Sequence, residues 1–104
     1  MSKKIHNKLV RDRIPEIIRA EGKEPLTRIL DKEEYLDELI KKLHEELEEF
    51  KEALNVEELA DIQEVILALA DALNIKHSHL GKTLSEKALK RGAFKKRIYL
   101  ESVE

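Results

Sequence analysis

The feature that most constrains the fold of this chain is a repeat of apolar residues between positions 36 and 54. Leu, Ile and Phe recur there at steps of three and four, at positions 36, 39, 40, 43, 47, 50 and 54. This spacing gathers them on one face of an α-helix. Asp31, followed three residues later by Glu34, has the spacing of an N-cap with a capping box. The pattern therefore predicts a long amphipathic helix that begins after Asp31.

A second helical pattern follows after a short connection. Asn55 can cap this helix, and its apolar stripe consists of Leu59, Ile62, Ile66, Leu69 and Leu73. Alanine and leucine leave the other faces unusually apolar as well. We therefore expect a central helix that is antiparallel to the first, is surrounded by protein and forms a subunit contact.

Two shorter helices are expected nearer the ends of the chain. One covers about residues 14–21, with Pro15 in its first turn and Gly22 beyond its end, and the other covers about residues 78–91 and ends at Gly92. Residues 26–30 and 97–100 have extended character, and we expect two short extended segments that can pair as strands. Together these patterns predict one domain over residues 1–104, an all-α fold resembling a small four-helix bundle.

The composition excludes several classes of protein. The chain has no cysteine, which excludes disulfides, zinc fingers, iron–sulfur clusters and cysteine nucleophiles. Its longest apolar run, residues 65–70, is far shorter than the roughly 20 residues that span a bilayer, and no signal peptide is recognisable. We expect a soluble, cytoplasmic protein with no membrane partner. A 12.1 kDa chain without tryptophan has a thin core, so a homodimer or higher homo-oligomer is expected.

The net charge of -2 conceals a strong segregation of charge. Residues 1–30 carry eight Lys/Arg and four acids, residues 65–104 carry the same numbers, and residues 31–64 carry fourteen acids and four lysines. Such a concentration of acids is costly unless the basic ends, other cations or a bound metal neutralise it, although a solvated acidic helix face is the alternative. An acidic centre also repels a phosphate backbone, so no nucleic-acid partner is expected.

Two pairs of carboxylates stand out within the acidic centre. Glu46 and Glu49 are three residues apart at the flank of the first apolar stripe, and Glu58 and Asp61 are three apart at the edge of the second. Facing pairs of this kind suit Mg²⁺ or Mn²⁺, which prefer carboxylate oxygens. Solvated acids, with Glu58 merely completing a capping box behind Asn55, explain the same spacing. The residues alone leave both readings open.

The same residues carry a resemblance to a known family. Residues 45–49 and 58–61 resemble the E-E-x-x-E and E-x-x-D signature of MazG-like all-α nucleoside triphosphate pyrophosphohydrolases. Residues 7–15 and 91–101 are similar to the two ends of a short subgroup described as phosphoribosyl-ATP pyrophosphohydrolase-like. Two departures exist: only eight residues separate Glu49 from Glu58, which requires a quick turn, and Ala93 stands where a second glycine is common. The resemblance implies a MazG-type fold over the whole chain.

The resemblance also implies an activity and a site. Nucleotide pyrophosphohydrolases of this kind use Mg²⁺ to cleave the bond between the α- and β-phosphates, often to remove non-standard nucleotides. The implied metal ligands are Glu46, Glu49, Glu58 and Asp61. Glu45 would be a further ligand or a base, so the implied catalytic residues are Glu45, Glu46 and Glu49. Phosphoribosyl-ATP pyrophosphohydrolase of histidine biosynthesis and a non-catalytic helical oligomerisation module remain alternatives.

The basic ends of the chain are candidates for binding the substrate. Guanidinium groups match phosphate oxygens with two parallel hydrogen bonds. Because they stand in the family-like segments, Lys8, Arg11, Arg91 and Arg97 are the expected substrate-binding residues. An ion pair between Arg11 and Asp12 that fixes the N-terminal segment is the structural alternative.

Overall fold

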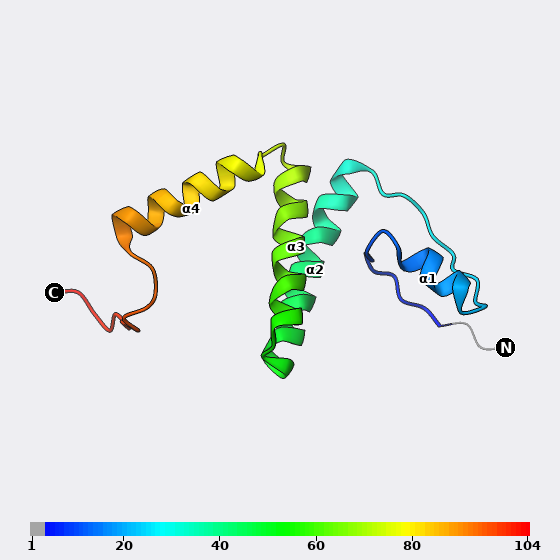
Figure 1. Cartoon of the computed structure of the whole chain (residues 1–104), viewed down its shortest axis with the longest axis horizontal. Coiled ribbons are helices and arrows are strands. Elements are labelled where there is room, and N and C mark those ends of the chain that lie inside the picture. The colour runs from blue at the N-terminus through cyan, green and yellow to red at the C-terminus, as the bar shows by residue number, and fades with distance from the viewer. Residues whose placement is uncertain (1–3) are drawn as a thin grey trace.

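The computed structural model describes residues 4–104, and this part of the chain is all-α (Figure 1). Its four helices are α1 (Ile14–Ala20), α2 (Lys32–Ala53), α3 (Val56–Ala72) and α4 (His77–Arg91). The predicted all-α class with four helices is confirmed, and the predicted helix bounds are close to those observed. The described residues contain no strand, so the predicted strand pairing is wrong. Residues 26–30 and 97–100 lie on opposite sides of α2 and α3, too far apart to pair.

Helices α2 and α3 form an antiparallel hairpin at the centre of the molecule. Each begins at the predicted N-cap: the Asp31 carboxylate accepts a hydrogen bond from the Glu34 backbone N–H at 2.9 Å, and the Asn55 side-chain oxygen accepts one from the Glu58 N–H at 3.0 Å. Leu54, with a left-handed φ of 50°, reverses the chain between them. The connection is therefore only Leu54 and Asn55, the quick turn that the short spacing requires.

The hydrophobic core of this hairpin is small. Among the described residues, the buried apolar side chains are Leu39 from α2 and Val65 and Ala70 from α3. Other members of the two predicted stripes, such as Leu47 and Leu59, are about half exposed. Within a single copy the second helix is not surrounded by protein, because α4 turns away from it, and the predicted subunit contact stays a prediction.

Helices α1 and α4 lie on opposite sides of the hairpin (Figure 1). At the α3–α4 turn the backbone N–H of Ile75 donates to the Ala70 carbonyl at 2.8 Å, and the His77 ring lies 2.9 Å from the Asp71 carboxylate. From this turn α4 extends away from α2, while α1 packs against no other helix of the described chain. The molecule is consequently elongated, 63 × 31 × 25 Å.

Residues 4–13 form an irregular segment, here called the N-terminal arm, that passes α2 and α3 before α1 begins. Within residues 4–104, no helix has both the length and the apolar character that crossing a bilayer requires.

Candidate metal centre

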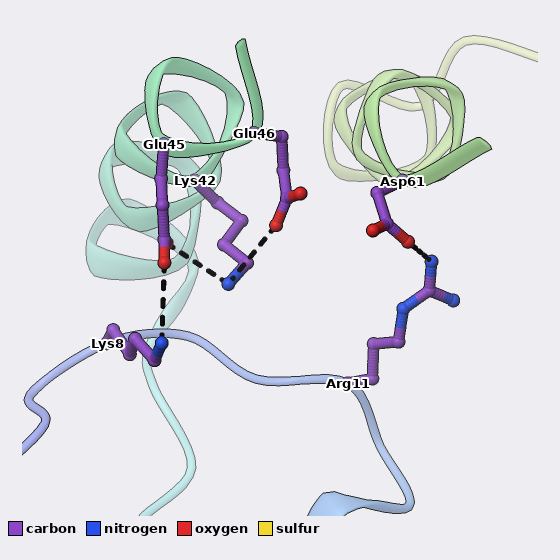
Figure 2. Close-up of polar contacts among 6 residues, drawn as sticks. All are labelled: Lys8, Arg11, Lys42, Glu45, Glu46 and Asp61. Carbon is purple, nitrogen blue, oxygen red and sulfur yellow. Dashed lines mark hydrogen bonds and ion pairs between the residues drawn. The ribbon is translucent and has the colours of Figure 1, made fainter. Parts of the chain in front are cut away.

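Three carboxylates converge between α2 and α3. Glu46 comes from α2, Glu58 and Asp61 come from α3, and one oxygen of each lies within 4.8 Å of the others. The two-residue connection sets this register, because it places the end of α2 beside the beginning of α3. Figure 2 shows the side chains of Glu46 and Asp61 pointing toward the side where the N-terminal arm crosses. The structure thus brings together three of the four predicted metal ligands.

The burial of these acids makes the cluster unusual. Glu46 is only 6% exposed, although α2 is otherwise a largely solvated acidic helix. One oxygen of Glu46 and one of Glu58, Oε2 in each, is buried without a hydrogen-bond partner in the described structure. Leaving a buried carboxylate oxygen unpaired is costly. Oxygens of this kind, gathered from two helices, are the donor set that a hard divalent cation prefers.

Glu49, the fourth predicted ligand, lies beside the cluster. Burial raises the pKa of Glu46, and the neighbouring carboxylates of Glu49 and Asp61 raise that pKa further. Desolvation likewise raises the pKa of Glu58, followed by the charges of Glu49 and Asp61. These carboxylates therefore repel one another when ionised, which a bound cation would relieve.

A lysine also enters the acidic site, and the sequence analysis did not identify it. The Nζ atom of Lys42 lies 3.1 Å from Glu45 Oε2 and 3.5 Å from Glu46 Oε1 (Figure 2). Burial acts to lower the pKa of Lys42, but its hydrogen bonds and charge interactions with Glu45 and Glu46 outweigh burial and raise that pKa. The sequence does contain a signal for this contact, because Lys42 is three and four residues before the two acids and such residues are neighbours on a helix.

Glu45 lies apart from the three-carboxylate cluster and is held by two lysines. Lys42 contacts one of its oxygens, and Lys8 of the N-terminal arm donates a hydrogen bond to the other at 3.3 Å. Burial acts to raise the pKa of Glu45, yet the two lysines outweigh burial and lower that pKa. Glu45 is thus an ionised carboxylate with a fixed position, next to the cluster rather than within it.

The four predicted substrate-binding residues divide into two groups. Arg11 lies at the cluster: its Nη2 donates to Asp61 Oδ1 at 2.6 Å, and its Nη1 is 3.6 Å from Glu64 Oε1. Arg11 therefore pairs with α3, not with Asp12. Lys8 is at the site through Glu45, whereas Arg91 and Arg97 belong to α4 and the segment after it, which lie away from the α2–α3 hairpin (Figure 1).

A small pocket lies between the N-terminal arm and α2. Its volume is about 110 Å³, and it is lined by Asn7, Lys8, Leu9, Glu38, Lys41, Lys42 and Glu45. Sites for whole small molecules usually measure roughly 300–1,000 Å³. This pocket is therefore too small to enclose a nucleoside, and none of the three cluster carboxylates lines it.

Comparison with known proteins identifies a relative. No family model and no solved structure matches the chain. The chain is similar to an uncharacterized protein of Mycolicibacterium smegmatis, with 37% identity over 84 residues, which cover 81% of this chain and 74% of that protein.

Proposed function

The chain belongs to the same family as the uncharacterized M. smegmatis protein, and we propose that it is a magnesium-dependent nucleoside triphosphate pyrophosphohydrolase. The observation that carries the proposal is the carboxylate cluster. Three acids from two helices converge within 4.8 Å, and two of their buried oxygens have no hydrogen-bond partner in the described structure. A cluster assembled only for stability would not bury unpaired acids that raise one another's pKa.

The residues fit Mg²⁺, with Mn²⁺ as a substitute. Glu46, Glu58 and Asp61 would hold the ion, and Glu49 remains the predicted fourth ligand. Their donors are all carboxylate oxygens, the chemistry that these hard cations prefer. When bound, the ion would neutralise the charge that grows on phosphate oxygens as pyrophosphate leaves.

Three side chains around the cluster have separate tasks in this proposal. Glu45, kept ionised by Lys42 and Lys8, would orient the attacking water and accept its proton. Lys8 and Lys42 line the small pocket, where they would bind phosphate oxygens of the substrate. No protein nucleophile is needed for this reaction.

The resemblance to MazG-like enzymes supports the reaction type. It favours cleavage between the α- and β-phosphates of non-standard nucleotides, in the cytoplasm and by a homodimer or higher homo-oligomer. Phosphoribosyl-ATP is the alternative substrate within this class. Arg91 and Arg97 stay predicted substrate-binding residues, and they would reach a site only if a second copy supplied them.

The test is hydrolysis of a substrate panel. The purified protein is incubated with Mg²⁺ and standard, deoxy- and oxidised nucleoside triphosphates, or with phosphoribosyl-ATP, and pyrophosphate and monophosphate are measured. Glu49→Gln should lower turnover by roughly 10- to 100-fold, since it removes a charge beside the metal ligands. Glu48→Gln on the exposed side of α2 is the matched control and should retain activity.

Two outcomes would contradict the proposal. Release of orthophosphate with nucleoside diphosphate would place the cleavage at the γ-phosphate. No turnover of any substrate, together with no effect of Mg²⁺ on thermal unfolding, would favour the helical oligomerisation module instead.

A further inference from the structure

Helix α4 and residues 92–104, here called the C-terminal arm, expose most of their apolar side chains. The exposed fractions lie between 67% and 97% for Leu84, Leu89, Phe94, Ile98, Tyr99 and Leu100. Scattered exposed leucines are ordinary on a protein surface, but a contiguous segment with six large apolar side chains in solvent marks an interaction surface. None of them has a partner in the described part of a single copy.

The surface area and the shape of the molecule lead to the same conclusion. A compact monomer of 12.1 kDa has about 6,000 Å² of accessible surface, whereas this chain has 10118 Å². A compact chain of 104 residues has a radius of gyration of about 13 Å, whereas the observed value is 18.2 Å. The excess surface is about 4,000 Å² per chain, or about 8,000 Å² for two copies, which is more than the roughly 2,000–5,000 Å² that an obligate homodimer buries in total.

Helix α4 mixes apolar and basic side chains around its surface. Leu84 and Ala88 lie one turn apart on one side of it, and Leu89 lies beside Lys82 on another. Its charge is basic: residues 77–104 carry seven Lys/Arg and three acids. Residues 32–53, which form α2, carry nine acids and four lysines. The hairpin also exposes apolar side chains, among them Ile40 and Leu47.

We propose that a second copy of this chain covers the C-terminal arm, and that the arm of each copy packs against the α2–α3 hairpin of the other. Each chain carries both complementary surfaces, a basic apolar arm and an acidic apolar hairpin. A twofold arrangement therefore satisfies both at once and closes without further copies. Beyond its first residues the arm does not pack on its own hairpin, because the hydrogen-bonded α3–α4 turn directs α4 away from α2. This assembly does not depend on the proposed activity.

Light scattering during gel filtration tests the assembly. The full-length chain should elute with a mass of twice 12.1 kDa. Leu89→Glu should produce a monomer with an unchanged far-ultraviolet circular dichroism spectrum. Leu26→Glu is the matched control, because Leu26 is as exposed as Leu89 but lies in the connection before α2; this variant should remain a dimer.

Cross-linking tests which surfaces meet, and the absence of native cysteine makes it clean. Chains carrying Leu89→Cys and chains of a different tagged length carrying Leu47→Cys are mixed and oxidised. A disulfide-linked product containing one chain of each length is expected, in clear excess over the product formed with Leu26→Cys. A monomeric wild-type chain, a dimeric Leu89→Glu variant or equal cross-linking of Leu26→Cys would each overturn the proposal, whatever the hydrolysis assay shows.

Discussion

The α2–α3 hairpin and the C-terminal arm both contain long helices and apolar side chains, yet a single copy buries those side chains to different degrees. In the hairpin, Leu39 is 2% exposed, and buried acids meet Lys42 and the N-terminal arm. In the C-terminal arm, Leu89 is 90% exposed, and its lysines and arginines contact no acid of the hairpin among the ion pairs of the described chain. Apolar side chains are therefore partly buried in the hairpin but exposed to solvent in the C-terminal arm.

This difference shows that a small chain must meet two separate requirements: it must form the geometry of a site, and it must bury enough apolar surface to be stable. The candidate metal centre needs only local geometry, which two consecutive helices with a short connection provide. Burial of enough apolar surface to stabilise 104 residues needs more than one hairpin, and the C-terminal arm has the surface but no partner within one copy. The three predictions below test this division, beginning with the largest expected effect.

Removing a core side chain from the hairpin should cost far more than removing an exposed one from the C-terminal arm. Leu39→Ala should lower the free energy of unfolding by about 2–5 kcal/mol, because it leaves a cavity in a very small core. Leu89→Ala should cost less than about 0.5 kcal/mol at dilutions where the chain is monomeric, and more as concentration rises. Urea unfolding at two protein concentrations measures both. If the two variants lost equal free energy of unfolding at high dilution, the hairpin core and the C-terminal arm would not differ in burial as described.

Magnesium should stabilise the hairpin through the carboxylate cluster. At a hundredfold excess over its dissociation constant, a ligand that binds only the folded state adds about 2.7 kcal/mol. Thermal unfolding with Mg²⁺ and with chelator should show this gain in the wild-type chain and in Glu48→Gln. Glu46→Gln should lose most of it. A gain that survives in Glu46→Gln would place the bound ion elsewhere.

The stability of the metal-free protein should fall as pH rises above about 4.5. The folded pKa values of Glu46 and Glu58 are raised, so the folded state binds more protons than the unfolded chain between the ordinary value of 4.5 and the raised values. The melting temperature in chelator should therefore be higher near pH 5 than at pH 7. In the double variant Glu46→Gln/Glu58→Gln this difference should shrink. An undiminished difference would assign the effect to other acids.

Much of the hairpin could be predicted from the sequence because its determinants are local. The caps at Asp31 and Asn55 act over three residues, and the apolar periods act over single turns. The convergence of Glu46, Glu58 and Asp61 follows from the same periods once the connection is known to be short. Neither periodicity nor capping requires knowledge of distant parts of the chain.

The contacts that the sequence analysis missed arise from packing. Arg11 and Asp61 are fifty residues apart and pair because the N-terminal arm crosses both helices, which no local pattern specifies. Lys42 resembled a solvated lysine because α2 is highly charged, and only its side-chain burial distinguishes it. The prediction of strand pairing was wrong for the same reason. Residues that favour an extended conformation do not indicate whether two segments lie close together in the fold.

The two-residue connection at Leu54 and Asn55 also has a consequence for the order of folding. Glu46 and Asp61 are close along the chain, so their approach closes only a short loop, and contacts of this kind form fast. Pairing between copies is bimolecular and slows on dilution. During refolding, the carboxylate cluster would therefore assemble at a rate that does not depend on protein concentration. Each newly made chain would carry a formed ion site before it meets another copy of the chain.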